Sequence, residues 1–90
     1  MREFEVKPHL QNILRKLHKK DKVAYEAVMK KIEEIVESST IEHYKNLRYD
    51  LKDKKRVHVA THFVLIFSYD KSKDFITFLD FEHHDAVYGR

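Results

Sequence analysis

Apolar residues near the start of the chain recur at helical spacing. After Pro8, four of them stand at positions i, i+3, i+4 and i+7: Leu10, Ile13, Leu14 and Leu17. This spacing places them on one face of a helix, and a proline fits the first helical position because its missing N–H needs no partner there. The pattern predicts a helix over residues 8–20. The helix ends in Lys19 and Lys20, cations that suit a helix C-terminus.

A second apolar stripe follows almost at once. Its members are Val23, Ala24, Ala27, Val28, Ile32, Ile35 and Val36. Asp21 stands directly before this stripe and can cap the N-terminus of a helix. We therefore predict a second helix over residues 22–38, and the short connection indicates an antiparallel helix hairpin.

After residue 43 the apolar positions change to the alternation that is typical of strands. Leu47, Tyr49 and Leu51, for example, alternate with polar residues. The same criterion predicts strands over residues 44–51, 55–60, 62–70 and 74–81, and a short first strand over residues 3–7. Because both helices precede the run of strands, we expect an α+β fold. The N-terminal strand and helix hairpin should pack on one face of an antiparallel sheet.

Length and composition narrow the possible classes of protein. A chain of 90 residues predicts a single domain over residues 1–90. The absence of Cys excludes a disulfide scaffold, an iron–sulfur site, a Cys-based zinc site and a thiol nucleophile. The longest apolar run, residues 63–67, is too short to span a membrane, and acidic residues stand where a signal peptide needs apolar ones. We expect a cytoplasmic protein that binds no membrane.

The positions of the charged residues along the chain are a better guide to nucleic-acid binding than the formal net charge of +3. One basic segment lies at the end of the first predicted helix. A second holds six cations: Lys45, Arg48, Lys52, Lys54, Lys55 and Arg56. Five of the seven His residues also fall in the second half of the chain: His43, His58, His62, His83 and His84. Either basic segment alone is equally compatible with a solvated surface.

The alternation in residues 56–59 sends Val57 and Val59 inward and Arg56 and His58 outward. On the sheet face that the helices leave open, we expect three further residues to join them: Arg48, His83 and His84. Metal-free RNA cleavage needs such groups, because arginine binds phosphate oxygens and histidine takes or gives a proton near neutral pH. Each residue also has a simpler interpretation as an exposed strand or C-terminal residue.

Four segments, taken in order, resemble the RelE/ParE superfamily of toxins from type II toxin–antitoxin modules. They are residues 45–48 (KNLR), 56–59 (RVHV), 63–67 (FVLIF) and 83–88 (HHDAVY). The resemblance covers nearly the whole chain and includes the order of helices and strands. It implies a RelE/ParE-like, microbial-RNase-like fold. It also implies an endoribonuclease that cleaves mRNA, often on the ribosome, and that a cognate antitoxin holds inactive in a heterocomplex.

The resemblance also implies roles for particular residues. The catalytic candidates are Arg56, His58, His83, His84 and Tyr88. The candidates for binding RNA or phosphate are Arg48, Lys52, Lys54, Lys55 and His62. The spacing of the His residues matches no known metal motif, so we expect neither a metal nor another cofactor. The expected partners are the antitoxin, mRNA and the ribosome.

The chain departs from the family pattern in two strands. The strand that begins at Phe63 lacks the family's arginine, for which His62 is the nearest substitute, and Tyr49 stands where the family has a glycine. Two alternatives to RNA cleavage therefore stay open. One is a ParE-like toxin that inhibits DNA gyrase and cleaves no RNA. The other is a catalytically degenerate member that only binds nucleic acid.

Overall fold

The structure, a computed structural model, describes residues 2–41, 44 and 54–83. In chain order these form β1 (Glu3–Val6), α1 (Pro8–Lys20), α2 (Lys22–Glu37), β2 (Lys54–Val59), β3 (Phe63–Asp70) and β4 (Phe75–His83). The two predicted helices and the corresponding predicted strands are confirmed, with bounds that agree to within two residues. The strand predicted over residues 44–51 lies outside the described residues, apart from Tyr44.

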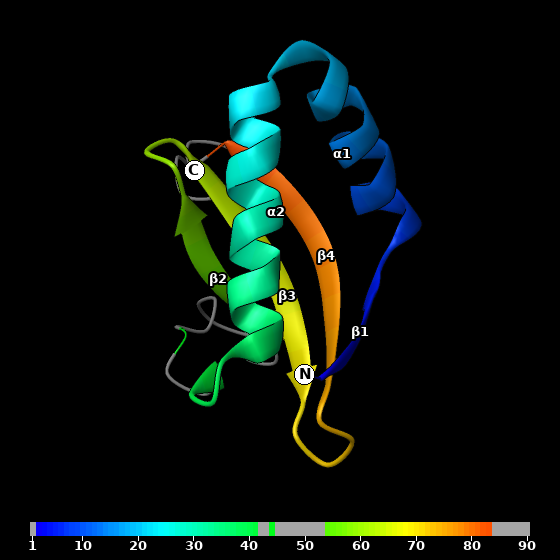
Figure 1. Ribbon diagram of the computed structural model, residues 1–90. Coiled ribbons are helices and arrows are strands. Elements are labelled where there is room, and N and C mark those ends of the chain that lie inside the picture. Colours follow the sequence, from blue (N-terminus) through cyan, green and yellow to red (C-terminus); the bar gives the residue numbers. More distant parts are fainter. Residues whose placement is uncertain (1, 42–43, 45–53, 84–90) are drawn as a thin grey trace.

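The described strands form a sheet in the order β1-β4-β3-β2 (Figure 1). β2, β3 and β4 are a meander of antiparallel strands, whereas β1 lies parallel to β4. Both helices lie across one face of this sheet (Figure 1). The predicted α+β class is confirmed. The sheet is mixed rather than wholly antiparallel, because the N-terminal strand joins β4 in the parallel orientation.

A single residue, Asp21, connects the two helices. Its backbone N–H donates to the Leu17 carbonyl at the end of α1 (2.8 Å), and its carboxylate accepts from the Ala24 N–H at the start of α2 (3.1 Å). The same residue therefore ends one helix and caps the next. An N-cap of this kind stabilises a protein by about 1 kcal/mol.

The core fills the space between the helices and the face of the sheet that they cover. Its largest side chains are Phe67 and Phe78, both fully buried, with ring centroids 5.9 Å apart. The helical stripes supply Leu10, Leu14, Val28, Ile32, Ile35 and Val36. The apolar faces predicted from the sequence are thus the buried faces, except at Val23 in the first turn of α2, which is 79% exposed. Neither helix of the described part is long and apolar enough to cross a membrane.

β4 carries a bulge opposite the centre of β3. Ile66 pairs with Asp80, whereas the next residue of β3, Phe67, pairs with Phe78, so Leu79 is an extra residue on β4. A bulge of this kind interrupts the alternation of side chains between the two faces. Residues of β4 beyond Leu79 therefore face the side opposite to the one that uninterrupted alternation predicts.

A network around Arg2 ties the N-terminus to the turn between β3 and β4. The Arg2 Nε donates to Asp74 Oδ1 at 2.7 Å, and the Tyr69 hydroxyl donates to the same oxygen at 2.6 Å. The Arg2 guanidinium also donates to the carbonyls of Val36 and Ser38 at the end of α2. Three separate parts of the chain are held together at this corner of the fold.

The burial of Phe78 predicts its effect on stability. Phe78→Ala should lower the free energy of unfolding by about 3–5 kcal/mol, because it removes a fully buried ring and leaves a cavity. The control is Phe4→Ala, since Phe4 contacts Phe78 edge-on at 5.8 Å but is 43% exposed. Urea denaturation followed by circular dichroism measures both variants. Equal losses would contradict the central place of Phe78 in the core.

The Asp74 network predicts a dependence of stability on acid pH. The hydrogen bond from the Tyr69 hydroxyl, and after it the one from Arg2, lowers the pKa of Asp74. A carboxylate whose pKa is lower in the folded state stabilises the protein above its unfolded pKa of about 3.9. That stability is lost as the pH falls through the folded pKa.

Asp74→Asn should therefore reduce stability at neutral pH and weaken its decline below about pH 4. Asn is a suitable replacement because residue 74 has a φ of 51°, a left-handed conformation that Asn tolerates. Glu26→Gln, which removes an exposed carboxylate from α2, is the control. Unfolding midpoints measured from pH 2 to 7 should separate the two variants, and identical pH profiles would argue against the network.

Candidate nucleic-acid interface

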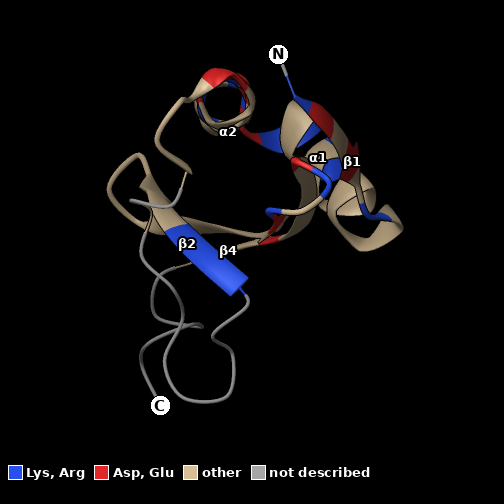
Figure 2. Cartoon of the chain, turned by 90° about the horizontal axis from the view of Figure 1, so that it is seen from below, with Lys and Arg blue, Asp and Glu red and all other residues tan. Residues whose placement is uncertain are grey.

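Three basic or titratable side chains alternate along β2. Lys54, Arg56 and His58 stand two residues apart and share one face of the strand, while Val57 and Val59 pack toward the core. The three therefore lie on the side of the sheet away from the helices, which we call the outer face. Figure 2 shows the basic start of β2 on this side, with α1 and α2 opposite. Alternation in the sequence predicts this arrangement for Arg56 and His58.

Two buried apolar side chains border this row on β3. The register places Val64 opposite His58 and Ile66 opposite Arg56. Val64 is 0% and Ile66 9% exposed, yet neither belongs to the core cluster beneath the helices. The centre of the outer face is therefore apolar, and it supports the basic row from one side. An apolar surrounding strengthens electrostatic interactions with a bound anion.

Carboxylates of β4 border the apolar strip on its other side. Glu82 pairs with Val64, and Asp80 pairs with Ile66, so two strand spacings, about 10 Å, separate the backbones of β4 and β2. Asp80 already has a partner, because its Oδ1 lies at hydrogen-bond distance, 3.0 Å, from the Nε2 of His9 on α1. Glu82 lies on the same face as His58, with Val64 between them.

Glu82 is a candidate that reasoning from the sequence missed. Uninterrupted alternation from Phe78 sends Glu82 inward, and the bulge at Leu79 sends it to the outer face. The spacing of Phe78 and Phe81 was the signal that could have revealed it. Two core aromatic residues three positions apart do not fit a regular strand, in which residues of one face are two apart.

Lys55 lies on the opposite side of β2 from the basic row. It pairs with the core residue Phe67, and its ammonium donates to the Tyr44 carbonyl at 3.2 Å. The structure therefore does not bring Lys55 together with Lys54 and Arg56, although the sequence placed Lys54 and Lys55 together among the candidates for binding RNA or phosphate.

His83 lies on the helix-facing side as well. It pairs with Phe63, which in turn pairs with the core residue Val59. The His83 ring stacks on His62 with centroids 5.8 Å apart and an interplanar angle of 3°, and it meets Phe63 edge-on at 5.7 Å. The bulge at Leu79 is the reason that His83 lies on this side, because the residues of β4 after the bulge point to the face opposite to the one that regular alternation predicts. His62 and His83 form a cluster of their own and do not join the outer face.

Four of the predicted site residues fall outside the described residues. They are Arg48, Lys52, His84 and Tyr88. Their expected roles stay predictions.

The described part of the outer face has the chemistry of a phosphodiester site. Lys54 and Arg56 provide positive charge, and the arginine fork matches two phosphate oxygens. The exposed imidazole of His58 can transfer a proton. Within residues 2–41, 44 and 54–83, no three His, Cys, Asp or Glu side chains gather into a group that could hold a metal ion.

Comparison with known proteins identifies the family. No family model matches the chain. A protein of Methanocaldococcus jannaschii that is named as a toxin, RelE4, is 48% identical over 90 residues, which cover all of this chain and 94% of that protein. The chain belongs to the RelE family of toxins. The resemblance seen in the sequence is thus confirmed over its whole length.

Solved structures of RelE-type toxins share the fold. A metal-bound toxin from Helicobacter pylori matches with a TM-score of 0.75 at 19% identity, over 98% of this chain and 100% of that chain. A chain of the intact E. coli RelBE toxin–antitoxin complex matches with a TM-score of 0.72 at 21% identity, over 92% and 96% of the two chains. The arrangement of two helices on a mixed sheet is therefore the RelE-type fold.

The two faces of β2 separate Lys54 from Lys55, and this separation predicts that only Lys54 would contact an RNA bound to the outer face. Lys54→Gln should weaken RNA binding at low salt. It should also reduce the slope of log affinity against log salt by about 0.7, the contribution of one phosphate contact on a single strand. Lys55→Gln removes the same charge from the next residue but on the other face, and it should leave the slope unchanged. Fluorescence anisotropy with a labelled single-stranded RNA, in a salt series, measures both. Equal slopes for the two variants would contradict this orientation.

Proposed function

We propose that this RelE-family protein, acting as one toxin domain over residues 1–90, is an endoribonuclease that cleaves mRNA on the ribosome. It needs no metal ion, works in the cytoplasm and is neutralised by a cognate antitoxin. The observation that carries the proposal is the row of Lys54, Arg56 and His58 on the outer face of the sheet. Its phosphate-binding cations and its titratable imidazole stand on one strand, on the side that the two helices leave uncovered.

RNA supplies its own nucleophile, so a site of this kind needs no metal-activated water. The ribose 2′-oxygen attacks the adjacent phosphorus, and its proton passes to a general base. The bond from phosphorus to the 5′-oxygen breaks, and a general acid protonates that oxygen. The products are a 2′,3′-cyclic phosphate and a 5′-hydroxyl, and the proton count balances without a further reactant.

The described residues divide this work by their chemistry. Arg56 binds the nonbridging oxygens and stabilises the charge that develops on the phosphorane. His58 transfers a proton, and Glu82, which shares the face across Val64, assists as a second acceptor. Lys54 binds a neighbouring phosphate. His84 and Tyr88 are proposed from the resemblance as further participants, with an imidazole as the acid.

The partner proposals have a separate basis. Solved toxin–antitoxin complexes of E. coli and Mycobacterium tuberculosis contain chains that share this fold, which supports a cognate antitoxin for this protein. The ribosome and mRNA are proposed as partners from the resemblance to the RelE/ParE superfamily. Comparing cleavage of an mRNA that is free with cleavage of the same mRNA bound to ribosomes tests the ribosome's part.

Substitutions on the outer face should abolish most of the cleavage. Arg56→Ala and His58→Ala should each lower the rate by roughly 10²-fold or more, since one loses charge stabilisation and the other a proton transfer. The matched control is Lys55→Ala, which alters the same strand on its other face. The wild-type rate should be bell-shaped in pH and unchanged by EDTA, and His58→Ala should remove one limb of the bell.

The same assays separate the alternatives. Cleavage that survives both Arg56→Ala and His58→Ala, or that requires added metal, would overturn the mechanism. Loss of DNA supercoiling by purified gyrase without any RNA cleavage would identify a ParE-like toxin instead. RNA binding with neither activity would identify a degenerate member.

A further inference from the structure

Four aromatic rings gather at one end of the sheet, where β2 ends, β3 begins and the described part of β4 ends (Figure 1). The rings of His62 and His83 stack with an interplanar angle of 3° and centroids 5.8 Å apart. Phe63 and Phe81 form a second stacked pair, with centroids 5.0 Å apart. Phe63 joins the two pairs, because it meets His83 edge-on at 5.7 Å. We call the pair of His62 and His83 the imidazole stack.

The two pairs differ in burial. Phe81 is 4% exposed and belongs to the core, and Phe63 packs against the core from its edge. His62 and His83 are both exposed. The phenylalanines therefore anchor the cluster, while the imidazoles lie at the surface. Parallel rings at a surface offer a flat face on which a further planar ring can stack.

The turn that carries His62 has a strained backbone. Residues 60–62 connect β2 to β3, and Ala60 has a φ of 54°. Glycine adopts this left-handed conformation readily, whereas a residue with a Cβ does so at a cost in energy. Strained residues of this kind persist where the surrounding structure holds them, and they cluster at sites that hold ligands. The turn gives His62 its place against His83.

The imidazole stack lies close to the basic row along the sheet, although it is on the other face. Phe63, which contacts His83, pairs with Val59, and His58 is the residue before Val59 on β2. One residue of a strand spans about 3.3 Å. A single-stranded RNA that passes over this end of the sheet can therefore place a phosphate near Arg56 and His58 and turn a neighbouring base toward the stack.

We propose that the imidazole stack of His62 and His83 binds an unpaired purine base of the RNA, next to the phosphodiester that the outer face binds. Proteins hold single-stranded bases by stacking them on aromatic side chains, histidine included. A purine covers more of a ring than a pyrimidine does. The assignment rests on the proposed function, because that function supplies the RNA. A metal ion fits less well, since no third His, Cys, Asp or Glu of the described residues gathers with this pair.

The test uses short RNAs that cannot be cleaved. One is a run of uridines with a single central adenine, and its counterpart has uridine throughout. Every ribose carries a 2′-O-methyl group, which removes the nucleophile. The full-length protein should bind the adenine oligonucleotide about fivefold more tightly in fluorescence anisotropy. With 2-aminopurine in place of adenine, binding should lower the fluorescence, because stacking quenches it.

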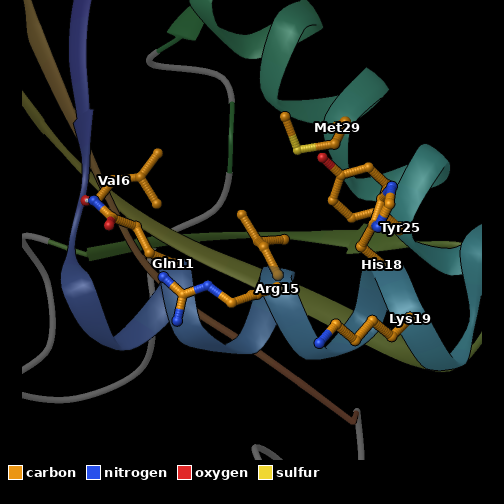
Figure 3. A pocket seen from close by; sticks show the side chains of 8 residues that line it. Val6, Gln11, Arg15, His18, Lys19, Tyr25 and Met29 are labelled. Atoms are coloured by element: carbon orange, nitrogen blue, oxygen red, sulfur yellow. Dashed lines mark hydrogen bonds between the residues drawn. The ribbon is translucent and has the colours of Figure 1, made fainter.

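Two substitutions of His62 separate stacking from other roles of an imidazole. His62→Ala removes the ring and should abolish both the preference for adenine and the quenching. His62→Phe keeps a flat ring and should preserve both. The matched control is His18→Ala, which removes another exposed imidazole. His18 meets Tyr25 edge-on at 4.8 Å in a groove between α1 and α2 (Figure 3), and its loss should change neither readout.

The opposing outcomes are distinct. A preference that survives His62→Ala, or that His62→Phe loses as fully as His62→Ala, would overturn the stacking assignment. Imidazole is also a ligand for zinc. An unfolding temperature that ZnCl₂ raises in the wild type but not in His62→Phe, with no preference for adenine, would show a metal site instead.

Binding and cleavage are measured separately, so the two proposals can fail independently. A preference for adenine without cleavage of unmodified RNA, free or bound to ribosomes, would contradict the proposed function alone. Cleavage by a wild-type protein that shows no preference and no quenching would overturn only the role of the imidazole stack.

Discussion

The parallel pairing of β1 with β4 is the contact on which the rest of the fold depends. It joins the first and last described strands, and the Lys7 N–H extends it to the Phe78 carbonyl at 3.0 Å. Since α1 begins directly after Lys7, the position of β1 on the sheet fixes where the helix hairpin lies. β4 in turn carries β3 and β2 on its other edge. When β1 pairs with β4, the long segment of chain between them becomes a closed loop. The loss of chain entropy on closing this loop is the largest that the topology requires.

Residues that lie on regular elements could be placed from the sequence alone. The stripes that contain Leu14 and Ile32 have clean helical periods, and both face the core. Alternation along β2 likewise placed Arg56 and His58 on the outer face. In each case one side of the element is buried against the core, so the apolar period reports directly which side that is.

The sequence could not place residues whose environment depends on pairing with another strand. The bulge at Leu79 is visible only in the register between β3 and β4. It moves His83 to the helix side, next to His62, and brings Glu82 to the outer face. β3 presents a related difficulty, because Val64 and Leu65 are both fully buried although they face opposite sides. When a strand is apolar on both faces, its sequence does not alternate, so the pattern does not show which residues face the helices.

The one-residue connection at Asp21 has a consequence for molecular recognition. Its backbone is hydrogen-bonded to the end of α1 and its side chain to the start of α2. This short, doubly bonded connection restricts movement of one helix relative to the other. The spacing between them is set before any partner arrives. A surface of fixed width loses little conformational freedom on association, and the adjustment falls on the other molecule. A partner that is unstructured until it meets this surface would supply that adjustment, and the ordering entropy would then be its own.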